Sequence, residues 1–174
     1  MSDIEVERYP DLDADERTTL SQFLDLYRHR ALSRLTILSD EQARTRILPA
    51  TKLTAGGVVK HLAHMEDHWF TARVGAGELP EPWGSAPAAQ SDWDLESAAD
   101  DSVEEIADLY RAACNRSRKV ADRLPSLEVR APRPSFGKVP VTLRWVMVHM
   151  IEETACHVGH LDLLTDPFVN LSDR

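Results

Sequence analysis

Four amphipathic segments dominate the chain, and they constrain its fold more than any other feature. Apolar residues recur at steps of three and four over roughly residues 14–38, 54–73, 102–124 and 142–164. This is the period of an α-helix that buries one face. No series of alternating apolar and polar residues indicates a sheet. The sequence therefore predicts an all-α fold, a four-helix bundle in a single domain spanning residues 1–174.

Local signals mark where several of these helices begin and end. Thr54 is a plausible N-cap of the second helix, and Ser102 with Glu105 forms the capping-box pattern at the start of the third. Pro125 ends the third helix. These signals indicate separate helices rather than one continuous rod.

Two connections are long for a bundle. Residues 74–101 exceed the ~12 to 15 residues usual for an unstructured loop, and they contain Trp83 and Trp93. Large aromatic side chains favour an ordered loop packed on the bundle. Residues 125–141 carry four prolines, which leaves a short hairpin and an extended crossover as open alternatives.

Composition excludes several classes of partner. The net charge is −9 and basic residues do not cluster, which argues against nucleic acid. No segment approaches the ~18 continuous apolar residues of a membrane span, and residues 1–10 lack the apolar core of a signal peptide. We therefore expect a cytoplasmic protein in which Cys114 and Cys156 are small buried apolar residues rather than a disulfide.

The second and fourth helical segments hold six of the seven histidines. Glu153 and His157 are four residues apart, so they share a face of one helix. If His61 faces them from the second helix, two imidazoles and a carboxylate converge, and this is the ligand set of a catalytic divalent metal with an open position. The alternative is a set of hydrogen-bonded core histidines. If a metal is bound, we expect the other histidines of these two segments to be hydrogen-bond partners of the ligands or to face the substrate: His64, His68, His149 and His160.

Several other charged residues are weaker candidates. We expect Glu66 and Asp67 to be surface groups or hydrogen-bond acceptors near the site rather than ligands. Glu152 points about 100° away from Glu153 on the helix, so we expect its carboxylate in solvent or between subunits. Arg144 is a candidate for an anionic substrate group, although most such residues form surface ion pairs.

Two stretches carry a resemblance to a known family. They are Gly-Gly-Val-Val-Lys-His-Leu-Ala-His-Met-Glu, residues 56–66, and the stretch 143–164, which includes Val-His-Met-Ile-Glu-Glu-Thr-Ala-Cys-His-Val-Gly-His. In these residues the chain resembles the DinB-like metal-binding superfamily, also called DinB/YfiT-like metalloenzymes, and within it the DUF664 branch. The resemblance covers nearly the whole chain and implies a DinB-like bundle with long crossover loops.

The resemblance also implies a site and a chemistry. Many members hold one divalent metal with three histidines, at the positions of His61, Glu153 and His157 in this chain. Glu153 departs from that pattern, but the related thiol-dependent maleylpyruvate isomerases use a His, Glu, His set. His160 stands where three-histidine members often have Gln, which suggests a role near the substrate. Characterised relatives use low-molecular-weight thiols, such as mycothiol or bacillithiol, as isomerases or S-transferases, and relatives commonly form homodimers.

These observations combine into one functional hypothesis and two alternatives. We expect a metal-dependent thiol S-transferase or isomerase acting on a small electrophile, with zinc as the first choice of metal and nickel, iron or manganese open. His64 and His160 are the candidates to move protons, and His68 stays open for the same role. Trp83 or Trp93 is expected near the mouth of the site, although a tryptophan packed elsewhere on the bundle is equally compatible with the sequence. The alternatives are a non-catalytic, stress-associated metal-binding protein and a structural homodimer.

Overall fold

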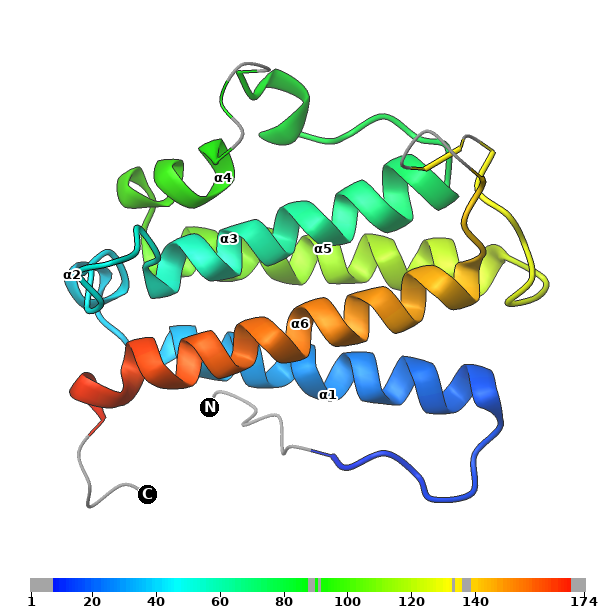
Figure 1. The fold of residues 1–174 in the computed structure, drawn as a ribbon, viewed down its shortest axis with the longest axis horizontal. Helices are drawn as coiled ribbons and strands as arrows, with labels where there is room; N and C mark the ends of the chain where they lie inside the picture. The colour runs from blue at the N-terminus through cyan, green and yellow to red at the C-terminus, as the bar shows by residue number, and fades with distance from the viewer. Residues whose placement is uncertain (1–7, 88–89, 91, 133, 136–138, 170–174) are drawn as a thin grey trace.

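A computed structural model describes residues 8–87, 90, 92–132, 134–135 and 139–169, and it confirms the all-α bundle (Figure 1). The four long helical units are α1 (Glu16–Thr36), α3 (Ala55–Glu66) continued by the π-helix η1 (Asp67–Val74), α5 (Val103–Arg123) and α6 (Leu143–Thr165). Short elements join them: α2 (Asp40–Ala43), η2 (Trp83–Ser85), α4 (Trp93–Glu96) and η3 (Ser97–Asp100), with η4 (Asp166–Phe168) following α6. The predicted bounds of α1, α5 and α6 lie within about two residues of these.

The direction of the helices explains the long central connection. In Figure 1, α1 and α6 run side by side in one direction, whereas α3 and α5 run side by side in the opposite direction. The chain that leaves α3 must therefore return along the length of the bundle before α5 can begin. This return path holds η2, α4 and η3, and α4 lies against α3.

The helix starts follow the local signals in the sequence. Thr54 accepts a hydrogen bond from the backbone N–H of Gly57, and Ser102 forms a capping box with Glu105. Thr142 caps α6 by accepting from the N–H of Trp145. Each such cap contributes about 1 kcal/mol by satisfying a backbone donor that the helix leaves free.

The apolar stripes pack into two neighbouring core clusters. Members of the first include Ala31, Leu35, Val58, Leu62, Ile106, Tyr110 and Leu161. Members of the second include Leu24, Trp69, Phe70, Leu143, Val146 and Met150. Burying one such Leu, Phe or Met side chain stabilises the fold by ~1.5 to 3 kcal/mol, so the stripes hold α3 and α6 in the register that the site requires.

Two consecutive acidic residues lie inside this core, and here the prediction of a surface location is wrong. Glu66 and Asp67 are both 0% exposed. Arg28 donates from Nε and Nη2 to the two carboxylate oxygens of Glu66 at 2.7 and 2.6 Å. Arg116 donates in the same two-bond manner to Asp67 at 2.8 and 2.7 Å. Successive helical residues point about 100° apart, so one carboxylate faces α1 and the other faces α5. Both carboxylates accept hydrogen bonds, but the donors are Arg28 and Arg116 rather than candidate ligands.

The central connection is ordered where the structure describes it, as its tryptophans predicted. Trp83 is 4% exposed and donates from Nε1 to Asp67 Oδ2 at 3.0 Å. Residues 125–141 contain a minimal antiparallel pairing, in which the N–H of Ala131 donates to the carbonyl of Val141 at 2.8 Å beside an isolated bridge between Arg130 and Thr142. Residues 88–89, 91, 133 and 136–138 lie outside the described part.

The two cysteines differ in their surroundings. Cys114 is buried as expected, but Cys156 is exposed, which corrects the prediction that both are core residues. Its position on α6 is on the outward side, with exposed Glu152 and Gly159 nearby on the helix. Among the described residues, no helix has the length and apolar character needed to cross a membrane. Residues 1–7, part of the stretch expected to lack a signal peptide, lie outside the described residues.

Candidate metal centre

Three side chains from two facing helices meet at one point. His61 comes from α3, and Glu153 and His157 come from successive turns of α6. Glu153 Oε1 lies 3.2 Å from His61 Nε2 and 3.4 Å from His157 Nε2. Ligand atoms of the three residues all lie within 4.8 Å of one another. The structure therefore brings together the three residues that the sequence singled out.

These spacings fit a small divalent cation. Two zinc–ligand bonds of ~2.1 Å at a tetrahedral angle place the ligand atoms about 3.4 Å apart. The two measured separations involving Glu153 are close to that value. The side chains of His61, Glu153 and His157 are 20%, 22% and 15% exposed, so an ion and a small ligand can reach them.

The second nitrogen of each imidazole is already in use. His61 Nδ1 lies 2.9 Å from Asp94 Oδ2, and a carboxylate only accepts, so Nδ1 donates and Nε2 is left for a cation. His157 Nδ1 lies 3.2 Å from His160 Nδ1. If His157 is the donor of that bond, its Nε2 likewise keeps a lone pair toward Glu153. Histidine ligands of metals ordinarily have such an outer partner, which fixes both the tautomer and the ring orientation.

The electrostatics of the three residues favour a positive charge between them. Burial alone would lower the pKa of His61, but its hydrogen bonds to Asp94 and Glu153 raise that pKa to about 9. Hydrogen bonds from His157 and His61 hold the pKa of Glu153 well below its usual range. Without a cation, a proton on His61 supplies the charge that Glu153 attracts. A divalent cation would take the place of that proton.

Asp94 is the residue of this site that sequence reasoning missed. It is 5% exposed, lies in α4, and its Oδ2 accepts from the Nδ1 atoms of both His61 and His64, at 2.9 and 2.8 Å. Burial opposes its ionisation, but these two hydrogen bonds hold the pKa of Asp94 well below its usual range. Helical spacing does not reveal it, because it comes from the long connection. Its position beside Trp93, in a segment expected to pack on the bundle, was the available signal.

The structure separates the four remaining histidines of these helices into two pairs. His64 and His160 contact the site through Asp94 and His157 respectively. His68 and His149 contact Trp69 instead, with ring centroids 5.3 and 4.9 Å away. Burial, together with the charge of Arg73, lowers the pKa of His68 to about 4. The first pair therefore stays the better choice for proton transfer.

Trp83 also lies beside the site. Its ring stacks on His64 at a centroid distance of 4.8 Å and an interplanar angle of 24°. Trp93 lies edge-on to Trp83 at 6.2 Å. Whether either tryptophan limits access to the metal position stays a prediction.

Solved structures share this fold. The crystal structure of a conserved protein from Enterococcus faecalis matches with a TM-score of 0.67 at 18% sequence identity, covering 89% of this chain and 99% of that one. At this identity the likeness concerns the fold alone. No curated protein sequence matches the chain.

The family sequence model described as Mycothiol-S-transferase matches residues 19–166. This range includes all four long helical units and the whole candidate centre. The chain belongs to the mycothiol S-transferase family. The resemblance to DinB-like proteins that the sequence showed is thereby confirmed.

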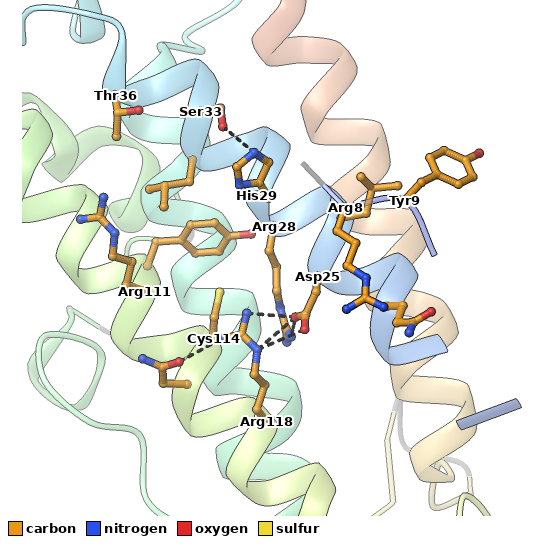
Figure 2. A pocket seen from close by; sticks show the side chains of 15 residues that line it. Arg8, Tyr9, Asp25, Arg28, His29, Ser33, Thr36, Arg111, Cys114 and Arg118 are labelled. Carbon is orange, nitrogen blue, oxygen red and sulfur yellow. Dashed lines mark hydrogen bonds and ion pairs between the residues drawn. The ribbon is translucent and has the colours of Figure 1, made fainter. Parts of the chain in front are cut away.

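This mycothiol S-transferase family member also has a large cavity elsewhere, of about 960 Å³, between α1 and α5 (Figure 2). Asp25 and Arg28 line it from α1, and Cys114 and Arg118 line it from α5. Asp25 pairs with both arginines, and burial raises the pKa of the Cys114 thiol to about 12. The cavity is not lined by His61, Glu153 or His157, and its thiol is protonated at neutral pH, so we assign the chemistry to the other side of the bundle.

Arg144, the candidate for an anionic substrate group, lies away from the site. It forms surface ion pairs with Glu16 and Glu128. Arg144 therefore forms surface ion pairs, which was the alternative given from the sequence.

Proposed function

We propose that this family member is a metal-dependent S-transferase that joins a low-molecular-weight thiol of the mycothiol type to a small electrophile. The observation that carries the proposal is the His61, Glu153 and His157 cluster, in which each imidazole has its outer nitrogen engaged and its inner nitrogen toward Glu153. Three protein ligands leave at least one coordination position for a ligand from solution. Zinc is our first choice of metal from these ligands, with nickel, iron and manganese as alternatives.

The residues have distinct roles in this scheme. His61, Glu153 and His157 hold the cation, and a cation at that position lowers the pKa of a thiol, which makes thiolate available at neutral pH. His64 donates from Nδ1 to Asp94, so its neutral form has a lone pair on Nε2 to accept the thiol proton. His160 is the second candidate for this proton.

The bond changes in the transfer balance with these groups alone. The thiol S–H bond breaks and its proton goes to an imidazole nitrogen. A bond then forms between sulfur and the electrophilic carbon of the substrate. In a displacement, the bond between that carbon and the leaving group breaks, the leaving group departs with the bonding electron pair, and the imidazole releases its proton to solvent. In an addition, a double bond of the electrophile opens and the proton goes to the atom that receives its electron pair. No oxidant or reductant is needed, which suits a protein that we place in the reducing cytoplasm.

The test is a transfer assay with metal-loaded protein. Zinc-loaded wild type is mixed with mycothiol and monobromobimane, and the rate of thioether formation above that of the uncatalysed reaction is followed by fluorescence. We expect turnover by wild type and by Glu152→Gln, which changes an exposed carboxylate on the same helix, and no turnover by His157→Ala. A wild type that holds zinc but transfers none of a panel of thiols would indicate the non-catalytic metal-binding alternative.

A further inference from the structure

We propose that Asp94 is a positioning residue that couples divalent-metal binding to the docking of residues 92–101 on α3. The docked segment, residues 92–101, comprises α4, η3 and their two flanking residues. The inference rests on the metal centre of the proposed function and adds a consequence for the long connection. The connection would then be part of the centre rather than a passive link.

Asp94 holds the metal-side imidazole in place. One oxygen, Oδ2, accepts from the Nδ1 atoms of His61 and His64, which lie one helical turn apart on α3. The other oxygen, Oδ1, accepts from the N–H of Leu95 at 2.9 Å. Both oxygens are therefore engaged, and the carboxylate orients His61 so that its Nε2 faces Glu153.

Further contacts tie the docked segment to α3 on either side of Asp94. Lys60 is 4% exposed, forms an ion pair with Asp101, and its Nζ lies 5.2 Å from the centroid of the Trp93 ring. Lys60 precedes His61 directly in α3. Consecutive residues of one helix thus bind both ends of the docked segment, and any shift of that segment changes the position of Asp94 relative to His61.

The close approach of the two elements depends on a glycine. A Cβ atom at Gly57 would lie 2.8 Å from the carbonyl oxygen of Leu95, which is shorter than real Cβ contacts. Gly57 is one helical turn before His61, and Leu95 follows Asp94. The missing side chain therefore lets α4 come near enough for Asp94 to reach both imidazoles.

Coupling between the ion and the segment follows from linkage. A divalent cation at Nε2 would carry one more positive charge than the proton that it replaces on His61, and it would therefore attract the Asp94 carboxylate more strongly. If docking of the segment raises the affinity for the metal by some factor, then binding of the metal raises the equilibrium constant for docking by the same factor. An outer hydrogen-bond partner of a histidine ligand typically contributes 10- to 100-fold to metal affinity.

The first arm of the test measures zinc affinity by competition with a chromophoric chelator. We expect Asp94→Ala to weaken zinc binding ~10- to 100-fold, whereas Asp100→Ala, which removes an exposed carboxylate from the same segment, leaves it unchanged. Gly57→Ala touches no ligand and is expected to weaken binding in the same direction. Its matched control is Gly159→Ala, since a Cβ there meets nothing within 4 Å on a helix that carries two ligands.

The second arm measures amide hydrogen exchange of residues 92–101 with and without zinc. We expect zinc to slow exchange there in wild type and in Asp100→Ala but not in Asp94→Ala. The inference would be overturned if Asp94→Ala bound zinc as tightly as wild type and zinc did not change the exchange of residues 92–101 in wild type. That result would leave the proposed function intact. Wild type that binds no zinc would instead overturn the proposed function. If Gly57→Ala does not fold, Asp94→Ala and the exchange measurement decide the question.

Discussion

Single residues of the centre differ in how directly they act. His61, Glu153 and His157 present the atoms that would bind a cation, whereas His64 reaches the centre only through Asp94. Glu153 stands where related three-histidine sites have an imidazole. Its charge leaves a divalent centre with a net charge of about +1 instead of +2, which strengthens ion binding but makes the cation a weaker attractor of a thiolate.

The role of His64 gives a prediction that separates binding from catalysis. His64→Gln should retain zinc, because it removes no ligand, but should lower turnover ~10²- to 10⁴-fold by removing the proton acceptor. Zinc content and thioether formation are measured on the same sample. His68→Gln is the control on the same helix, and it should keep turnover near that of wild type. Turnover that survives His64→Gln would transfer the proton-accepting role to His160.

His68 predicts a pH dependence of stability. Its pKa is about 4 in the folded protein, below the usual ~6.5 of an unfolded chain. Above pH 6.5 the residue is neutral in both states. As the pH falls from 6.5 toward 4, the unfolded state takes up a proton that the folded state does not, so the free energy of unfolding decreases by ~1 to 3 kcal/mol. Urea unfolding between pH 7 and 4 should show a smaller decrease for His68→Gln, and equal decreases would rule this out.

At the scale of elements, the sequence predicted the long helices, because these follow from the period of the apolar residues. It did not predict contacts between segments that are distant in the chain. The apolar stripes and the caps Thr54 and Ser102 located the long helices. The change from α3 to the π-helix at Asp67 was not predicted, because the apolar residues of this segment were read at the α-helical steps of three and four. Asp94 bonds to histidines 33 and 30 residues earlier in the chain, a contact that only the folded return path creates.

The buried pair between α1 and α3 can be tested by stability. Glu66→Gln would leave the Arg28 guanidinium, which is 5% exposed, without its fully buried partner. Removing one partner of a buried ion pair costs about 3 to 5 kcal/mol. We expect urea unfolding to show a loss of this size, against almost none for Glu152→Gln, whose side chain is 70% exposed. A loss below 1 kcal/mol would mean that Asp25, the other partner of Arg28, is sufficient.

At the scale of the whole molecule, the bundle places the candidate centre between α3 and α6 and covers it with the return path from α3 to α5. Helical spacing predicted the bundle and the shared face of Glu153 and His157, and the family resemblance selected His61 as their partner. The structure brings the three residues together, and metal binding by them stays a prediction. The arrangement of the helices explains why a connection of unusual length belongs to the site. Membership of the mycothiol S-transferase family agrees with a small thiol as one substrate.

Assembly is a further property of the whole molecule. We expect a homodimer, because two-fold pairs are the commonest oligomers of soluble proteins and apolar side chains on the outer side of α6, Val148 and Leu163, are 51% and 62% exposed. Sedimentation at micromolar concentration should give twice the mass of one chain. A strict monomer under those conditions would contradict this expectation.

The central claim is that His61, Glu153 and His157 hold a divalent metal, and metal content tests it most directly. Wild type, His61→Ala, His157→Ala and His64→Ala are stripped with a chelator, reloaded with zinc, desalted and measured by elemental analysis, with circular dichroism to confirm folding. We predict about one equivalent of zinc in wild type and in His64→Ala, and almost none in His61→Ala and His157→Ala. Full metal in His157→Ala with none in His64→Ala, or no metal in wild type after loading with zinc, nickel, iron or manganese, would contradict the account.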